Sequence, residues 1–555
     1  MMKSARTELF IVLIALLLFV PGLGAVHLFD WDEINFAEIA REMLVTGDYM
    51  RPQVDFQPFW EKPPLFMWMQ ALCMTVFGVG EFAARLPDAI CGVVTLLVLY
   101  RIGKRLRNEV FGLLWVLAYI GSILPHLYFR SGIIDPWFNL FIFLSLHAFV
   151  LLCWNREGRP AGPAGAGHVR YAVLAGVFLG LATLTKGPVA FLILALTTGI
   201  YWILQRFKMF FPVPKVLLAL MVMLAVDFLW FGLDWAINGS WFWETFITYQ
   251  YRLFSTPDAG HAGFLGYHFV VLLFGCFPAS LFAIHEMVKP TGGDAANNDY
   301  RRWMIILFWV VLILFSIVKS KIVHYSSMCY FPLTFLAALS MERLWRGEVK
   351  APMWLRLPLG AIGSSVALVF IVAPFVGMRI DLIKPLVADP FGRANLDADV
   401  VWTGVEAIAG IWMAVVLFFG HRNFSRGDFK RGLPVVFGGT ALFVPITLFF
   451  FINNIEGYSQ RAAVEFFEAR AKDSANGHPN YVKNRNYRSY AQLFYTRKQP
   501  PADPRAYDEE WLFHGDIDHP VFLVTKITDE EGVTSIGTFT ELYRKNGFIF
   551  YRREP

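Results

Sequence analysis

The chain has little charge for its length, and this shortage excludes most classes of soluble protein. Only 17% of its 555 residues are Asp, Glu, Lys or Arg, whereas 56% are hydrophobic. Soluble globular proteins carry about 25% charged residues. The composition therefore disfavours a secreted disulfide scaffold, a disordered chain and a nucleic-acid-binding protein. It predicts a membrane protein instead.

Cysteine is also scarce. The five cysteines are scattered along the sequence, mostly inside apolar runs, and no two have the spacing of a CxxC metal or redox motif. Isolated cysteines in apolar surroundings are typical of small buried hydrophobic residues. We therefore expect neither a disulfide framework nor a thiolate metal site from Cys73, Cys91, Cys153, Cys276 and Cys329.

What the sequence does have is long apolar runs, and they predict a polytopic α-helical membrane protein with about 13 transmembrane helices. Lys and Arg concentrate in alternate loops, which predicts a cytoplasmic N-terminus and an outer C-terminal segment. The predicted spans are 9–27, 86–102, 110–124, 136–153, 171–184, 189–204, 213–234, 264–286, 303–318, 327–341, 355–377, 400–420 and 433–452.

The composition changes near residue 453, and this change predicts two domains. Residues 1–452 form the transmembrane domain, and residues 453–555 are polar enough for a small soluble α/β domain on the outer face. Within the second domain we expect a helix over Arg461–Lys472 and strands over Pro520–Thr525 and Gly547–Arg552. A Gly- and Pro-rich inner loop, Gly158–Gly167, reads as a flexible connector.

The first outer loop is long and amphipathic. Apolar residues between Phe36 and Leu44 recur at helical spacing, while Glu38, Arg41 and Glu42 fall on the opposite face, which we expect to be solvated. A second helix is expected over Leu65–Val76, directly after two prolines. Two such helices in the interface plane would cover a cavity at the outer surface of the membrane.

Two acidic residues stand at predicted outer helix starts and are candidates for catalysis. Asp32, followed by Glu33, lies where the first span ends, and Asp135 precedes Pro136 at the start of the fourth. An acid at the mouth of a cavity is placed to act as a general base, an orienting group or a metal ligand. The alternative is that each simply caps its helix.

Basic side chains also gather on the outer side, where the positive-inside rule disfavours them. Together they could bind the phosphate or diphosphate of a lipid. The alternative is that these side chains extend to lipid headgroups. The basic candidates are Lys62, Arg130, Lys186, Lys319 and Lys321, and the residues that could complete such a pocket are His261, His324 and Tyr325.

Five motifs carry a resemblance to a known family. In this order along the chain, they resemble those of the aminoarabinose transferase (ArnT) branch of the protein mannosyltransferase superfamily. Asn35-Phe36 stands where family members often have Arg-Tyr, and Phe59 where they often have Tyr. The motifs are Asp32–Met43, Phe59–Pro64, Ile134–Pro136, Thr185–Pro188, and Lys319–Tyr325 followed by Pro332.

This resemblance implies a GT-C membrane glycosyltransferase of the bacterial inner membrane. Such an enzyme moves one sugar from a polyprenyl (undecaprenyl) phosphate carrier to a periplasmic-side acceptor, here lipid A or another envelope glycolipid. By resemblance, Asp32 and Asp135 are the catalytic acids and Lys62 contacts the donor phosphate or the acceptor. Glu33, Arg130, Lys186, Lys321 and Tyr325 are expected to bind substrate.

The motifs require no cofactor, but the resemblance allows a divalent metal ion held by Glu61 and His261. Two alternatives to the expected function remain open. One is a related enzyme that transfers a sugar to protein or to a cell-wall polymer. The other is a transporter or flippase of lipid-linked sugars, although a transporter would concentrate its charges near the middle of the membrane.

Overall fold

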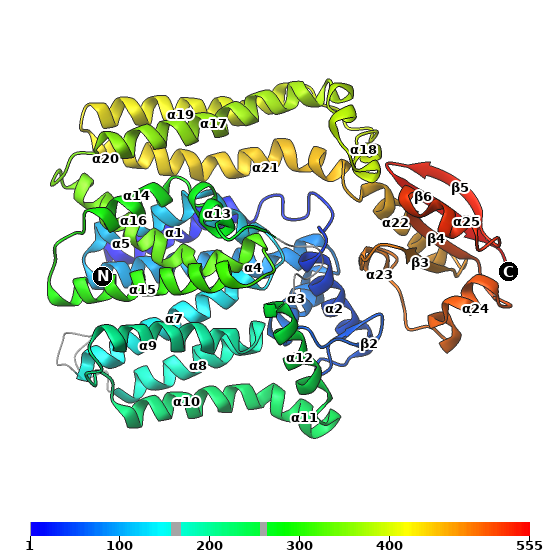
Figure 1. Cartoon of the computed structure of the whole chain (residues 1–555), viewed down its shortest axis with the longest axis horizontal. Helices are drawn as coiled ribbons and strands as arrows, with labels where there is room; N and C mark the ends of the chain where they lie inside the picture. Colours follow the sequence, from blue (N-terminus) through cyan, green and yellow to red (C-terminus); the bar gives the residue numbers. More distant parts are fainter. Residues whose placement is uncertain (1, 157–167, 256–262) are drawn as a thin grey trace.

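The structure is a computed structural model that describes residues 2–156, 168–255 and 263–555. Long, roughly parallel helices make up most of the molecule (Figure 1). Two short helices, α2 (Asp32–Thr46) and α3 (Leu65–Phe77), lie at one end of this bundle, and a small sheet lies beyond them. The connector expected at 158–167 falls outside the described residues.

Each of the thirteen predicted apolar runs contains a helix, although residues 20–27 of the first run and 400–404 of the twelfth lie outside helices. Among the described residues, eight helices are long and apolar enough to cross a membrane, and two further pairs qualify but are bent by 82° and 111°. The other three runs correspond to α1, α9 and α16, so a polytopic helical fold is confirmed while the number of crossings stays a prediction. The three shorter helices are α1 (Met2–Phe19), α9 (Val189–Leu204) and α16 (Tyr330–Trp345).

The longer helices account for the remaining runs. The eight candidate spans are built from α4 (Glu81–Leu106), α7 (Asp135–Arg156), α8 (His168–Lys186), α10 (Val213–Asp227) with α11 (Leu233–Asn238), α15 (Ala295–Ile317), α17 (Met353–Gly377), α19 (Ile408–Ser425), and α20 (Phe429–Leu433) with α21 (Gly439–Gly457). The two bent pairs are α5 (Glu109–Ile120) with α6 (Ile123–Leu127) and the 3-10 turn Tyr128–Arg130, and α13 (Tyr267–Gly275) with α14 (Ala279–Val288).

Small residues let these helices approach closely. Gly103 on α4 faces Gly112 on α5, and a Cβ added at Gly103 would lie 2.8 Å from the Gly112 Cα. Because lipid tails are as apolar as the helix surfaces, such close backbone packing is a main source of helix association in a bilayer.

The five cysteines are all free, as the sequence predicts.

The polar face of α2 is not solvated, and on this point the sequence prediction is wrong. Glu38, Arg41 and Glu42 are all at least 98% buried. The hairpin of β1 (Gln53–Val54) and β2 (Gln57–Pro58) follows α2, and the Glu42 carboxylate accepts hydrogen bonds from the backbone N–H groups of Asp55 and Phe56. Arg41 pairs with Glu38 at 2.7 Å. The polar groups of these side chains are satisfied inside the fold. Burial, together with the nearby Glu38, raises the pKa of Glu42 to about 9.

The C-terminal region contains a four-stranded sheet with the order β3-β4-β6-β5, in which only the β3–β4 pair is parallel. One hydrophobic cluster joins this sheet to α2 and α3, so the two sides share a core. The boundary at residue 453 stays a prediction.

The elements of the C-terminal region are α22 (Arg461–Ala475), β3 (Tyr481–Arg485), α23 (Ala491–Tyr495), α24 (Glu509–His514), β4 (Val521–Lys526), α25 (Glu530–Thr534), β5 (Thr540–Lys545) and β6 (Phe548–Arg553). Two shorter helices elsewhere are α12 (Trp241–Ser255) and α18 (Pro390–Asn395).

Candidate active site

A single cavity of about 910 Å³ brings most of the predicted site residues together. Its wall is built from the α1–α2 loop, the segment before α3, the start of α7, the α8–α9 turn, α12 and the segment before α16. Residues of α4, α6, α15 and α21 and two residues of the C-terminal region complete it. The predicted residues that line it are Asp32, Glu33, Glu61, Lys62, Arg130, Asp135, Lys186, His324 and Tyr325. His261 lies outside the described residues.

The two acids are the first residues of their helices. Asp32 begins α2, and the preceding capping position is Trp31, whose side chain makes no capping bond. Asp135 begins α7 and is 98% buried. A carboxylate at a helix N-terminus is favoured by the helix dipole. Asp135 gains more from Lys186, whose ammonium donates to the Asp135 Oδ1 at 2.6 Å.

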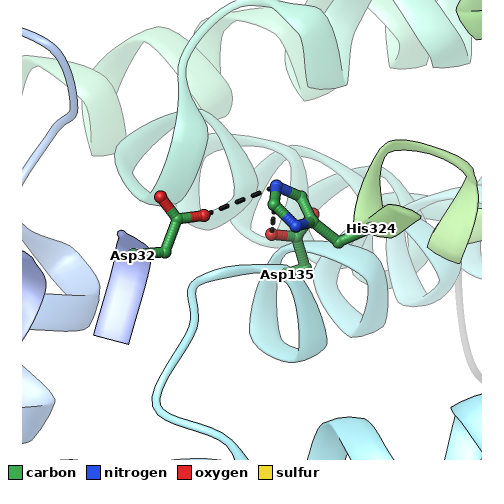
Figure 2. Close-up of side chains that lie close together, drawn as sticks. All are labelled: Asp32, Asp135 and His324. Atoms are coloured by element: carbon green, nitrogen blue, oxygen red, sulfur yellow. Dashed lines mark ion pairs between the residues drawn. The ribbon is translucent and has the colours of Figure 1, made fainter. Parts of the chain in front are cut away.

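The His324 ring nitrogen faces both acids, as the dashed lines in Figure 2 show. Its Nε2 is 3.4 Å from the Asp32 Oδ2 and 4.0 Å from the Asp135 Oδ2. Burial lowers the pKa of His324 more than the two nearby carboxylates raise it. The sequence placed His324 only among residues that could complete a pocket, because nothing in its motif indicates that two acids 189 or more positions away converge on its ring.

Lys62 is a partly buried cation with few partners among the described residues. Its ammonium donates to the backbone oxygen of Glu61 at 3.2 Å and lies 5.0 Å from the centre of the Tyr249 ring. Burial lowers the pKa of Lys62, against the opposing influence of Glu61 and Asp32. The Glu61 carboxylate itself accepts a hydrogen bond from the Tyr249 hydroxyl at 3.2 Å. A desolvated ammonium of this kind is suited to bind an anion that enters the cavity.

Glu33 has a positioning role. Its two oxygens accept hydrogen bonds from Arg85 at 3.0 and 2.8 Å, and from the backbone N–H groups of Phe29 and Gly132 at 3.0 and 2.8 Å. These four donors occupy the carboxylate from both sides. The expectation that Glu33 binds substrate therefore has little support in its contacts, although the residue lines the cavity.

Arg130 and Lys321 are also held by contacts within the protein. Arg130 lines the cavity and donates to the carbonyls of Leu18 and Pro21, at the end of α1, both at 2.5 Å. Lys321 is not among the cavity-lining residues, contrary to expectation. Its ammonium turns back to the end of α15 and donates to the carbonyls of Phe315, Ser316 and Val318. Terminal helix carbonyls need such donors.

We expect Lys321→Ala to lower the free energy of unfolding by about 1.5–3 kcal/mol, because three helix-terminal carbonyls lose a charged donor. Denaturant unfolding of the detergent-solubilised protein measures this change. Lys319→Ala is the matched control, since Lys319 is exposed two residues away and should change stability by less than about 0.5 kcal/mol. Equal losses in the two variants would contradict the helix-capping role.

Several cavity residues were not predicted from the sequence. Arg252 comes from α12, and Arg488 and Tyr490 come from the loop after β3. No local motif marks them, since their place in the cavity depends on how the C-terminal region packs. Tyr325 was predicted, and its ring centre lies 5.4 Å from the Lys186 ammonium.

Comparison with known proteins gives matches along most of the chain. Residues 61–230 match the family described as dolichyl-phosphate-mannose-protein mannosyltransferase. An undecaprenyl phosphate-α-4-amino-4-deoxy-L-arabinose arabinosyl transferase of Edwardsiella ictaluri is 28% identical over 389 residues, which are 68% of this chain and 67% of the relative. A protein of the same name from Shewanella sediminis is 24% identical over 403 residues, 71% of this chain and 69% of the relative.

The fold matches over nearly the whole length. The crystal structure of ArnT from Cupriavidus metallidurans bound to undecaprenyl phosphate superposes with a TM-score of 0.76 at 19% identity. The match covers 98% of this chain and 97% of that one. The sequence and structural matches agree with the motifs that line the cavity, and together they support an ArnT-like GT-C membrane glycosyltransferase.

Proposed function

We propose that this protein transfers a single sugar from a polyprenyl (undecaprenyl) phosphate carrier to a lipid acceptor, lipid A or another envelope glycolipid. One observation carries this proposal: Asp32, Lys62, Asp135 and Lys186 line the same cavity, at the end of the bundle next to α2. A carboxylate and an ammonium group in one partly enclosed space are what transfer from a glycosyl phosphate needs.

Lys62 and Lys186 are proposed to bind the donor phosphate. As the bond between the sugar C1 and the phosphate oxygen breaks, negative charge accumulates on the phosphate, and the two ammonium groups stabilise that charge. The Lys186 ammonium is held by Asp135 and packs against the rings of Phe138 and Tyr325. Apolar cavity residues such as Ile193 and Ile452 offer a surface for the carrier's hydrocarbon chain.

Asp32 is proposed to act on the acceptor side. Its side chain is one third exposed, in contrast to the buried Asp135, so its carboxylate remains accessible from the cavity. If the acceptor is a hydroxyl, Asp32 accepts its proton as the acceptor oxygen bonds to C1. If the acceptor is an ionised phosphate, Asp32 orients it and stabilises positive charge on the sugar. Direct displacement inverts the configuration at C1.

Sugar choice is proposed to depend on three nonpolar or neutral residues. Asn35, Phe36 and Phe59 all line the cavity. They occupy the positions where the resemblance leads us to expect Arg, Tyr and Tyr. Fewer hydrogen-bonding groups at these positions favour a sugar with a different polar pattern from aminoarabinose.

The membrane orientation completes the proposal. Lys and Arg in alternate loops support a multi-pass protein of the bacterial inner membrane with a cytoplasmic N-terminus. Residues 453–555 would then form a periplasmic domain next to the cavity. The chemistry would take place on the periplasmic side, where a lipid-linked sugar meets an envelope acceptor.

Transfer can be tested with purified protein, a polyprenyl-phosphate sugar and lipid A in nanodiscs. We expect glycosylated acceptor and free polyprenyl phosphate in equal amounts. In the same assay, Lys62→Ala should lower the transfer rate by about 10²–10³-fold, because a partly buried charge partner of the leaving phosphate is lost. Mass spectrometry of both lipids measures the two products.

The matched control is Lys319→Ala, which removes an exposed lysine outside the cavity and should leave the rate unchanged. A donor that crosses the bilayer but stays chemically intact would contradict transfer and favour a transporter. Sugar found on a protein or cell-wall polymer instead of the lipid would change the acceptor class and keep the reaction.

A further inference from the structure

The arrangement of Asp32, Asp135 and His324 has the form of a ligand set. One oxygen from each acid and one histidine nitrogen lie within 4.8 Å of one another (Figure 2). The three side chains come from the start of α2, the start of α7 and the turn before α16, which meet only in the folded protein. Ligand atoms about 2.1 Å from a common ion lie roughly 3–4 Å apart, close to the separations of 3.4 and 4.0 Å found here.

The Asp135 Oδ2 lacks a hydrogen-bond donor among the described residues. The Asp135 side chain is 98% buried, and Oδ2 has no hydrogen-bond partner among the residues that the structure describes. In that same part of the chain, no hydrogen bond joins the His324 ring to either carboxylate. A buried carboxylate oxygen without a donor is costly, so an ion or a proton donor from outside the chain is expected to meet it.

The rest of the Asp135 carboxylate is already fixed. Lys186 donates to Oδ1 at 2.6 Å, which leaves Oδ2 facing His324 and the cavity. A partner that orients a ligand from behind is the usual support of a metal site. Asp32, one third exposed, can rotate its carboxylate by the small amount that closer coordination requires.

The charges around the cluster also favour a bound cation. Two carboxylates face His324, whereas one ammonium, that of Lys186, pairs directly with them. The Lys62 ammonium donates instead to the Glu61 backbone oxygen. A divalent cation would more than offset the negative charge left on the two carboxylates and convert three converging lone pairs from a repulsive into a favourable contact.

We infer that Asp32, Asp135 and His324 form a binding site for one divalent transition-metal ion, Mn²⁺ or Zn²⁺. Two carboxylate oxygens and one imidazole nitrogen suit these ions. Three protein ligands leave coordination positions open toward the cavity. This site differs from the pair suggested by the family resemblance, Glu61 and His261.

The role of such an ion rests on the proposed function. When bound, it would supply a positive charge for the oxygens of the donor phosphate, next to Lys62 and Lys186. His324 would then act as a ligand that fixes the ion between the two acids. Ion binding itself requires no substrate and can be measured separately.

The test uses full-length protein in detergent, stripped of metal with a chelator and titrated with MnCl₂ or ZnCl₂. Calorimetry, and for Mn²⁺ the loss of its free-ion electron paramagnetic resonance signal, measures binding. We expect one site in the wild type. His324→Ala and Asp135→Asn should weaken binding by about 100-fold or more, since loss of a supporting group alone costs 10–100-fold.

Glu61→Gln and His268→Gln are the matched controls. Glu61 belongs to the alternative metal pair, and His268 is a buried histidine whose Nδ1 lies 3.0 Å from the Ser326 hydroxyl, outside the cluster. Both should bind the ion as tightly as the wild type. Binding that survives His324→Ala but is lost in Glu61→Gln would overturn the assignment, and so would a wild type that binds neither ion.

A wild-type measurement covers the case in which the cluster variants fail to fold. Electron spin echo modulation of bound Mn²⁺ should reveal one coordinated nitrogen, and the same signal should persist in Glu61→Gln. Its absence would overturn the site. If the ion binds as expected but no sugar is transferred, the proposed function fails alone. If metal-free protein transfers sugar and binds no ion, this inference fails alone.

Discussion

An Asp32→Asn variant is expected to lose sugar transfer by about 10²–10⁴-fold while remaining folded. The substitution keeps the size of the side chain but removes the negative charge and most of the basicity. Asp32 is one third exposed and no other residue pairs with it at less than the 3.4 Å to His324 within the described chain, so the fold depends little on its charge. The Asp32 carboxylate therefore serves the reaction rather than the stability of the fold.

The measurement is the initial rate of free polyprenyl phosphate release, with a melting temperature for the same preparation. Asp48→Asn is the matched control: Asp48 lies in the same outer loop, outside the cavity, and its carboxylate accepts backbone hydrogen bonds from Met50 and Arg51. It should retain the wild-type rate. Full activity in Asp32→Asn would remove Asp32 from the reaction and with it the main support for the site.

Local patterns predicted most of the helices and the acids of this site. Apolar runs need only a membrane-length stretch of residues, and both Asp32 and Asp135 stand at helix starts that the sequence marks plainly. The helix over Phe36–Leu44 in the first outer loop, part of α2, was predicted from its spacing. Its polar face, however, is buried. That failure has a physical cause, because the residues that cover Glu42 belong to a hairpin 13 positions further on.

Within the site, contacts between residues far apart in the sequence could not be predicted. Lys321 and Tyr325 stand in one motif, and spacing cannot tell which of them faces the cavity. The turn before α16 sends the Lys321 ammonium to the end of α15 and the Tyr325 ring to Lys186. His324 meets Asp32 across more than half of the chain, and Arg488 reaches the cavity from the C-terminal region.

Arg85→Ala is expected to cause the largest loss of stability, about 3–5 kcal/mol. Arg85 on α4 pairs with Glu33 at 2.8 Å, with side chains only 5% and 8% exposed. Its guanidinium also donates to the carbonyls of Leu23, Val26 and His27, in the loop that leads to α2. Removing one partner leaves an uncompensated buried charge on Glu33. Denaturant unfolding in detergent measures the loss.

Arg101→Ala is the control, because Arg101 makes a 2.6 Å ion pair with Glu8 but is 56% exposed, so its loss should cost at most about 1 kcal/mol. A double variant, Glu33→Gln with Arg85→Met, removes both charges and should recover part of the stability. Its rate of sugar transfer should remain below that of the wild type, because Arg85 and Glu33 hold the loop that positions Asp32. Equal losses for Arg85→Ala and Arg101→Ala would mean that the loop before α2 is held by packing alone.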